Sequence, residues 1–151
     1  MARIYEKSSW GILYRKNNNK IDILLLEWTN SKGQTELVIP KWHMEDGETA
    51  SQTALRETSE ETWLQIKDLE IIKFITKLNY TFTAWYLDDN PLIDKDVYLF
   101  LIKYKWNDEP RPQKEERFVW YKWVSIEDVK KLDDIKFDLS GIVGKNRTYF
   151  I

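Results

Sequence analysis

Four glutamates and one arginine near the middle of the chain have the types and the spacing to do chemistry together. They are Glu48, Arg56, Glu57, Glu60 and Glu61. On a helix the last three glutamates occupy positions i, i+3 and i+4, so their carboxylates would share one face within roughly 100°. Like charges so placed destabilise a helix by about 0.2–0.5 kcal/mol per pair, so a positive group should compensate them. A cluster of oxygen ligands without Cys or His suits a hard cation such as Mg²⁺ or Mn²⁺. The alternative interpretation of these glutamates is an acidic helix face exposed to solvent.

The segment that carries these glutamates has the features of a helix. Thr49 can serve as its N-cap, and Gln52 three residues later completes a capping-box pattern. Residues 50–62 contain no Gly or Pro and are rich in good helix formers. Leu55, Thr58 and Thr62 fall on another side of this helix, where it could pack against a sheet.

Residues 42–64 as a whole resemble the Nudix box, the signature of hydrolases that act on a nucleoside diphosphate linked to another group. That pattern is Gly, five residues, Glu, seven residues, then Arg-Glu-aliphatic-any-Glu-Glu-any-Gly-aliphatic. The residues in register with it are Glu48, Arg56, Glu57, Glu60, Glu61 and Leu64. The resemblance implies an α/β fold, the Nudix α/β/α sandwich, in a single domain over residues 1–151. Its mixed sheet would carry a catalytic helix at about residues 50–62.

The resemblance also implies a role for each residue of the motif. The metal ligands would be Glu57, Glu60, Glu61 and the backbone carbonyl of Lys41. One of these glutamates could also act as the base. Arg56 would orient a neighbouring glutamate, and Glu48 would support the loop and the metal site.

Residues outside the box extend the candidate site. Residues 40–43 resemble the Pro-Lys-Gly-His of the dinucleoside-tetraphosphate branch, in which Lys41 and His43 would contact phosphate. Glu115 and Glu116 lie eight and seven residues before Trp123, where many family members place an additional catalytic or metal-binding glutamate, and Glu116 is the candidate catalytic residue. The alternative for either glutamate is a solvated charge run.

Aromatic residues near position 80 could contribute to nucleotide binding. Tyr80 could stack on a base, a contact worth about 1–3 kcal/mol, although such residues more often belong to a core.

Both glycines of the box are replaced by tryptophan in this chain. They are Trp42 and Trp63, and Thr58 fills the aliphatic slot. Position 42 lies in a tight loop where family members need a residue without a Cβ close to the metal. Trp63 follows the last helical turn, where glycine commonly takes the left-handed conformation. A tryptophan in that conformation costs on the order of 1 kcal/mol or more.

Tryptophan also replaces a glycine near the N-terminus. Residues 8–14 resemble the first strand of many Nudix proteins, and Trp10 stands at its first glycine. The chain has 8 Trp and 5 Gly in 151 residues, whereas average usage predicts roughly 7% glycine. Because some bacteria read the codon UGA as glycine, we hypothesise that Trp10, Trp42 and Trp63 are glycines in the natural product. UGG at these codons would contradict the hypothesis.

Composition excludes several classes of protein. The hydrophobic fraction of 42% and the charged fraction of 32% are typical of a soluble globular protein, and a net charge of −2 gives no attraction to DNA. The absence of cysteine excludes disulfides, thiolate metal sites and cysteine nucleophiles. With no apolar leader and no run of about 18 apolar residues, we expect a cytoplasmic protein that does not contact a membrane.

The pattern of apolar residues predicts the elements that must position the helix. Strands are predicted at residues 9–15, 21–27, 36–39, 69–77, 79–86, 97–105 and 117–124. Loops are predicted at residues 16–20, 28–34, 87–96 and 107–116. A second helix is predicted from Ile126 to about Leu132, and a short one at about residues 140–145. This order suits the sandwich that the resemblance implies.

The resemblance therefore implies metal-dependent hydrolysis of a pyrophosphate bond. The expected substrate is a dinucleoside polyphosphate such as diadenosine tetraphosphate. Alternatives are an RNA 5′-end pyrophosphohydrolase and a nucleoside triphosphate pyrophosphatase. An alternative of another class is a Nudix module that binds nucleotide without hydrolysing it, which Trp42 and Trp63 favour and the helix glutamates oppose. A monomer or a homodimer is expected.

Overall fold

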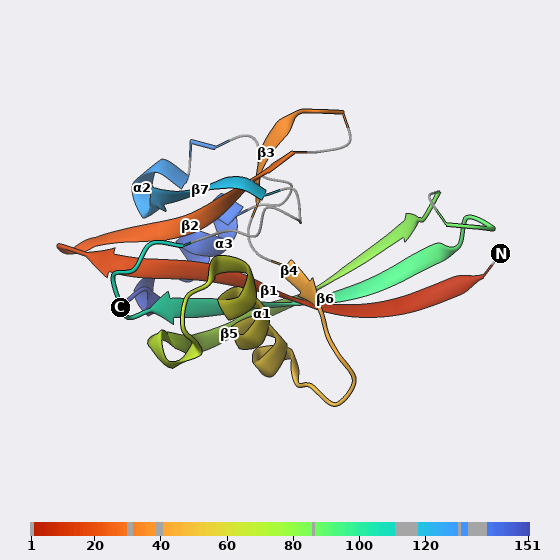
Figure 1. Ribbon diagram of the computed structural model, residues 1–151, viewed down its shortest axis with the longest axis horizontal. Coiled ribbons are helices and arrows are strands. Elements are labelled where there is room, and N and C mark those ends of the chain that lie inside the picture. Colours follow the sequence, from red (N-terminus) through yellow and green to blue (C-terminus); the bar gives the residue numbers. More distant parts are fainter. Residues whose placement is uncertain are drawn as a thin grey trace.

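The computed structural model describes residues 2–29, 32–38, 41–85, 87–110, 118–129, 131–132 and 139–151; of residues 28, 38, 41–43 and 118–120 it describes the backbone alone. The strands are β1 (Arg3–Asn17), β2 (Lys20–Thr29), β3 (Thr35–Val38), β4 (Lys41–His43), β5 (Leu69–Thr83), β6 (Leu92–Tyr104) and β7 (Phe118–Ser125). The helices are α1 (Ala50–Thr62), α2 (Ile126–Val129) and α3 (Leu139–Lys145), with 3-10 turns η1 (Ile66–Asp68) and η3 (Arg147–Tyr149). Helices lie on both sides of the sheet (Figure 1), and no helix in the described residues is long and apolar enough to cross a membrane.

The seven strands of the described chain form one mixed sheet. Its main order is β3-β2-β1-β6-β5, with β4 paired to β1 and β7 paired to β2. β1 runs parallel to β6, and the other pairs are antiparallel. The predicted α/β class with a mixed sheet is therefore confirmed.

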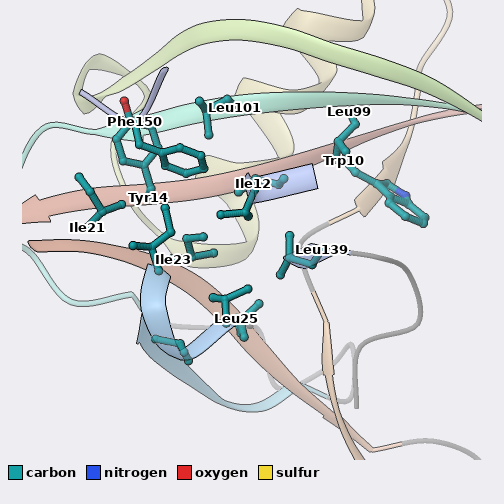
Figure 2. Packing of buried hydrophobic residues seen from close by; sticks show 14 of the residues in the cluster. Trp10, Ile12, Tyr14, Ile21, Ile23, Leu25, Leu99, Leu101, Leu139 and Phe150 are labelled. Carbon is teal, nitrogen blue, oxygen red and sulfur yellow. The ribbon is translucent and has the colours of Figure 1, made fainter. Parts of the chain in front are cut away.

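Alternate residues of the central strands point to opposite faces of the sheet and form two separate cores. On one face Ile12, Tyr14 and Leu99 pack with α2 and α3 (Figure 2). On the other face Leu13 and Ile102 pack with α1. This alternation follows the two-residue period of a strand and produces the predicted three-layer sandwich.

Helix α1 packs close to β1 at a glycine. A Cβ atom at Gly11 would lie 2.9 Å from Cδ1 of Ile102 and 3.6 Å from Oγ1 of Thr58. The hydroxyl of Ser9 donates a 2.7 Å hydrogen bond to the carbonyl of Ala50 at the start of the helix. Together these contacts set the height of α1 above the sheet.

Several predicted boundaries were correct and others were wrong. Helix α1 begins and ends where it was predicted, and α3 differs by one residue. The predicted strands 69–77 and 79–86 are one strand, β5, and the predicted loop 87–96 is wrong from Leu92 onward, where β6 begins. The predicted strand 9–15 is the middle of a longer strand, β1. The charged residues of these extensions hid them, because an exposed strand lacks the apolar signal on which the prediction depended.

The extensions form an arm that projects from the body of the molecule. It consists of residues 3–8 of β1, 78–83 of β5 and 92–97 of β6, and its three strands extend together to the right in Figure 1. On one face the Tyr5 hydroxyl donates to Asp96, and the amide of Asn79 donates to Asp94 and Asp96 at 2.9 Å each. These bonds stabilise the charged residues that the sequence pattern did not predict to form a strand.

Candidate active site

The start of α1 is held by the predicted capping box. The backbone amide of Gln52 donates to Oγ1 of Thr49 at 3.2 Å, and the backbone amide of Thr49 donates to Oε1 of Gln52 at 2.9 Å. The preceding loop turns at Gly47, whose φ of +83° is a conformation that favours glycine. The loop and the cap bring Glu48 to the side of the helix that carries Arg56.

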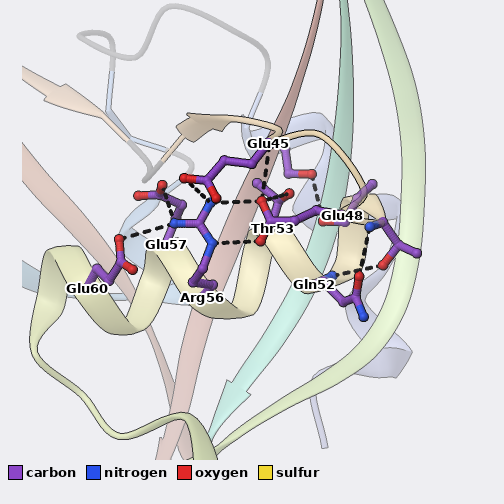
Figure 3. Close-up of polar contacts among 10 residues, drawn as sticks. Glu45, Glu48, Gln52, Thr53, Arg56, Glu57 and Glu60 are labelled. Atoms are coloured by element: carbon purple, nitrogen blue, oxygen red, sulfur yellow. Dashed lines mark hydrogen bonds and ion pairs between the residues drawn. The ribbon is translucent and has the colours of Figure 1, made fainter.

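Arg56 is the centre of the site, because its guanidinium binds carboxylates from the loop and from its own helix (Figure 3). Its Nε and Nη2 atoms donate to the two oxygens of Glu48 at 2.6 and 2.8 Å, a bidentate pair. Its Nη1 atom donates to Glu57 at 2.7 Å and to Glu60 at 3.2 Å. The positive group required by the acidic face is therefore Arg56 itself, and its predicted contact with a neighbouring glutamate is present.

The carboxylate of Glu48 accepts more hydrogen bonds than those from Arg56. The Thr53 hydroxyl donates to it at 3.0 Å, and the backbone amide of Glu45 donates at 3.1 Å. The hydrogen bond from Arg56, with these two donors, lowers the pKa of Glu48 to about 2. Glu48 therefore fixes the loop to the helix as an anion.

The three helix glutamates lie at different depths. The side chain of Glu57 is 20% exposed, that of Glu60 is 54% exposed, and Glu61 is 2% exposed. A buried carboxylate is costly unless hydrogen bonds or a cation compensate it. Glu60 is thus the glutamate of this group most accessible to solvent.

These side chains fit a divalent cation by their chemistry, because carboxylate oxygens are the ligands that hard cations prefer. In the described part of the chain, however, no three His, Cys, Asp or Glu side chains are close enough together to hold a metal ion. The carboxylates of Glu48, Glu57 and Glu60 are directed at Arg56 instead. The side chains of Glu57 and Glu60 would have to rotate away from Arg56 to complete a metal site.

The C-terminal end of α1 has the geometry that the sequence predicted for a glycine. Trp63 adopts φ 61° and ψ 16°, the left-handed conformation, and its side chain is 66% exposed. The hydroxyl of Ser59 donates to the carbonyl of Leu64 at 2.6 Å and closes the turn. Because the indole is mostly exposed, its burial offsets little of the cost of the left-handed backbone conformation.

The remaining predicted residues of the box lie on β4, next to β1. In the backbone register, Lys41 is opposite Trp10, Trp42 is opposite Ser9, and His43 is opposite Ser8. This pairing places the Lys41 carbonyl on the strand that leads into the site loop. The side chains of residues 41–43 and all of Glu116 lie outside the described structure.

Tyr80 lies on the arm rather than in the arginine cluster. Its ring stacks on that of Trp10, with centroids 5.9 Å apart and planes inclined by 27°. Trp10 alternates with Ser9 and Gly11, which face α1, so Trp10 and Tyr80 lie on the opposite face of the sheet. Among the described side chains, the structure thus brings Glu48, Arg56, Glu57 and Glu60 together, and Tyr80 stands apart from them.

Two residues of the arginine cluster were missed from the sequence. Thr53 is fully buried and holds Glu48 from the first turn of α1, and a carboxylate oxygen of Glu45 lies 3.7 Å from Nη2 of Arg56. Thr53 precedes Arg56 by three positions, so the helical period could have placed it on the same face. Glu45 is in the loop, where no periodicity is available.

Comparison with known proteins agrees with this geometry. The family model for the NUDIX domain matches residues 6–142. The chain is 32% identical over 140 residues to the bis(5′-nucleosyl)-tetraphosphatase (asymmetrical) of Sus scrofa, covering 91% of this chain and 86% of that protein. It is 33% identical to the Mus musculus protein of the same name over 127 residues, covering 83% of this chain and 78% of that protein.

A solved structure gives the same result. The C. elegans Ap4A hydrolase in a binary complex has a TM-score of 0.71 and 25% identity, and the match covers 95% of this chain and 96% of that one. The family model, the two sequence relatives and the solved structure all match most of the chain. This chain therefore belongs to the Nudix family and is a pyrophosphohydrolase of nucleoside polyphosphates.

Proposed function

We propose that the substrate is a dinucleoside polyphosphate, diadenosine tetraphosphate in particular, and that its phosphate chain is divided unequally. The observation that carries this proposal is the similarity to two tetraphosphatases named as asymmetrical, at 32% and 33% identity over most of the chain. Unequal division of four phosphates releases a nucleoside triphosphate and a nucleoside monophosphate. Equal division would release two nucleoside diphosphates.

In the proposed reaction, the residues of α1 prepare a water molecule for attack on phosphorus. Glu60 takes the proton from this water, because its carboxylate is the most exposed of the three helix glutamates. Glu57 is held at 2.7 Å by Arg56, which sets the direction of its carboxylate. Arg56 is itself fixed by the bidentate contact with Glu48, so the cluster is rigid on the side that faces the loop.

The proposed metal ligands are Glu57, Glu60, Glu61 and the Lys41 carbonyl, and the proposed ion is Mg²⁺ or Mn²⁺. Such an ion, when bound, screens the phosphate charge and lowers the pKa of a bound water molecule. Glu61 is 2% exposed, and a cation beside it would offset the cost of burying a carboxylate.

The proposed substrate contacts come from β4, the arm and the segment before β7. Lys41 and His43 contact phosphate from β4, which enters the site loop directly. Glu116 supplies a further catalytic carboxylate from the segment before β7. Tyr80 stacks on a base from the arm, where its exposed ring already lies against Trp10.

The test is hydrolysis of diadenosine tetraphosphate with Mg²⁺, with separation of the products. Two proteins are compared: the printed chain, and a variant with Trp10→Gly, Trp42→Gly and Trp63→Gly. We expect ATP and AMP as products, with higher activity in the glycine variant. Two ADP molecules, or no hydrolysis by either folded protein, would contradict the substrate assignment.

Two further substrates separate this proposal from its alternatives. RNA with a 5′-triphosphate tests the RNA 5′-end activity, and single nucleoside triphosphates test the pyrophosphatase activity. A kcat/KM higher for either than for diadenosine tetraphosphate would replace the proposed substrate. Glu60→Gln and Glu57→Gln serve as matched controls, because each removes a carboxylate and keeps the side-chain shape. We expect the larger loss of kcat from Glu60→Gln.

A further inference from the structure

The outer edge of the arm is an exposed strand edge. β5 is the last strand of the main sheet path in the described chain. Its register with β6 is irregular between Ile71 and Lys73 and between Phe74 and Thr76, and is regular from Thr76 to Thr83. Residues 79–83 are all exposed. The backbone groups on the outer side of this segment are therefore accessible for pairing with another strand.

Within residues 78–83 this edge has none of the features that normally prevent strand pairing. Proteins protect edges with charged residues, prolines, bulges or short strands. Residues 78–83, Leu-Asn-Tyr-Thr-Phe-Thr, contain no charged residue and no proline, and every residue of the segment has a regular partner on β6. The other two arm strands differ, because β6 carries Asp94, Lys95 and Asp96 between its two neighbours, and the opposite edge of the arm, on β1, carries Arg3, Glu6 and Lys7. The uncharged stretch is thus confined to the β5 edge of the arm.

We propose that this edge pairs with the same edge of a second copy of the chain, antiparallel and about a two-fold axis near Tyr80. A two-fold axis perpendicular to the sheet keeps each face on its own side, so residues of the same parity meet. Leu78 then faces the partner's Phe82, and Asn79 faces the partner's Thr81.

The segment is complementary to itself in charge and in polarity. The pairs on one face are apolar or aromatic, and those on the other face are polar, so neither face opposes an apolar side chain to a charge. At the ends of the paired segment Lys77 meets the partner's Thr83, and no like charges face each other. The Asn79 amide already donates to Asp94 and Asp96, so its donors are satisfied within each copy.

The pairing also extends an apolar row on one face of the arm, in which Ile93 is buried and its two neighbours are partly exposed. Ile4, Ile93 and Phe82 lie side by side on one face, and Ile4 and Phe82 are each 39% exposed. In the dimer this row continues into the partner's Leu78 and Val97. A narrow ribbon gains stability from additional strands, so the pairing would stabilise the arm.

Position 83 provides a matched test, because opposite charges can be placed there next to the partner's Lys77. The measurement is the dimer dissociation constant by sedimentation equilibrium for the printed chain, Thr83→Glu and Thr83→Lys. Each dimer contains two such contacts, and cross-strand charge pairs contribute about 0.2–1 kcal/mol each. We expect Thr83→Glu to bind about tenfold more tightly than Thr83→Lys, equivalent to about 1.4 kcal/mol.

The double variant Lys77→Glu with Thr83→Lys checks the register. It restores opposite charges across the interface, so its dissociation constant should return to that of Thr83→Glu. Both positions are exposed, and circular dichroism should show that every variant is folded. A monomer at all concentrations, or equal dissociation constants for the two Thr83 variants, would overturn the proposal.

Discussion

Replacement of Trp63 by glycine is expected to stabilise the fold. The residue adopts φ 61° and ψ 16°, which costs a residue with a Cβ roughly 1–2 kcal/mol and costs glycine nothing. Glycine also makes the unfolded chain more flexible, which lowers stability by about 0.4–1 kcal/mol and offsets part of this gain. The exposed indole contributes little burial. We therefore expect the free energy of unfolding to increase by about 0.5–1 kcal/mol, which corresponds to a rise in Tm of about 1–4 °C for a chain of this size.

The assay is urea unfolding of the printed chain, Trp63→Gly, Trp63→Asn and Trp63→Ala. Alanine removes the indole and keeps the Cβ, so it separates backbone strain from loss of the side chain. The free energy of unfolding should be highest for glycine, intermediate for asparagine, and similar for alanine and tryptophan. If alanine stabilised the protein as much as glycine, the backbone argument would be refuted.

The same position offers a direct test of the recoding hypothesis. Mass spectrometry of the natural product should find glycine in the peptide that contains residue 63. Tryptophan in that peptide would contradict the hypothesis and leave the strain unexplained. The geometry at this position is independent of the codon, so the stability measurement and the peptide mass are separate tests.

Two further predictions concern the polar cluster and the helix contact. The pKa of Glu48 is lowered from 4.5 to about 2, chiefly by its hydrogen bond with Arg56. The contribution of this carboxylate to stability is therefore complete above pH 4.5 and is lost as the pH falls toward 2. Glu48→Gln should flatten the pH dependence of the free energy of unfolding between these two pH values, and an unchanged pH dependence would contradict the prediction. Gly11→Ala should destabilise by about 1–3 kcal/mol, because the new Cβ would lie 2.9 Å from Cδ1 of Ile102. The double variant with Ile102→Val removes that atom, and thermal unfolding should show a cost smaller than the sum of the two single variants.

The site helix could be predicted because its signals are local. Thr49 and Gln52 mark its start, and the unbroken run of helix formers continues to the left-handed residue at position 63. The strands of the body were also found, because buried stretches such as Leu24–Leu26 are continuous apolar runs. The sequence did not show how deeply each glutamate is buried. The helical period places Glu57, Glu60 and Glu61 on one face, but only the packed structure shows that Glu61 is buried and Glu60 is exposed.

The arm could not be predicted because its stability comes from pairing between distant segments. Residues 92–96 contain two aspartates and a lysine, which indicate a loop when they are considered alone. In the structure this segment lies between β1 and β5, and it satisfies its backbone on both sides. Tyr5 and Asn79 supply the side-chain partners for Asp96 from two strands that are far apart in the sequence. Such contacts leave no periodic pattern in the sequence.

The charge balance around Arg56 connects the fold to the reaction. Carboxylates of Glu45, Glu48, Glu57 and Glu60 all lie within 4 Å of this one guanidinium, so the cluster carries an excess of three negative charges. A polyphosphate would be repelled by such a cluster, and the repulsion is stronger near a protein surface than in bulk water. The cluster is therefore complementary to cations rather than to the substrate, and nucleotide binding should depend on cations that enter first. This is the physical reason to expect divalent ions to control substrate affinity as well as the hydrolytic step.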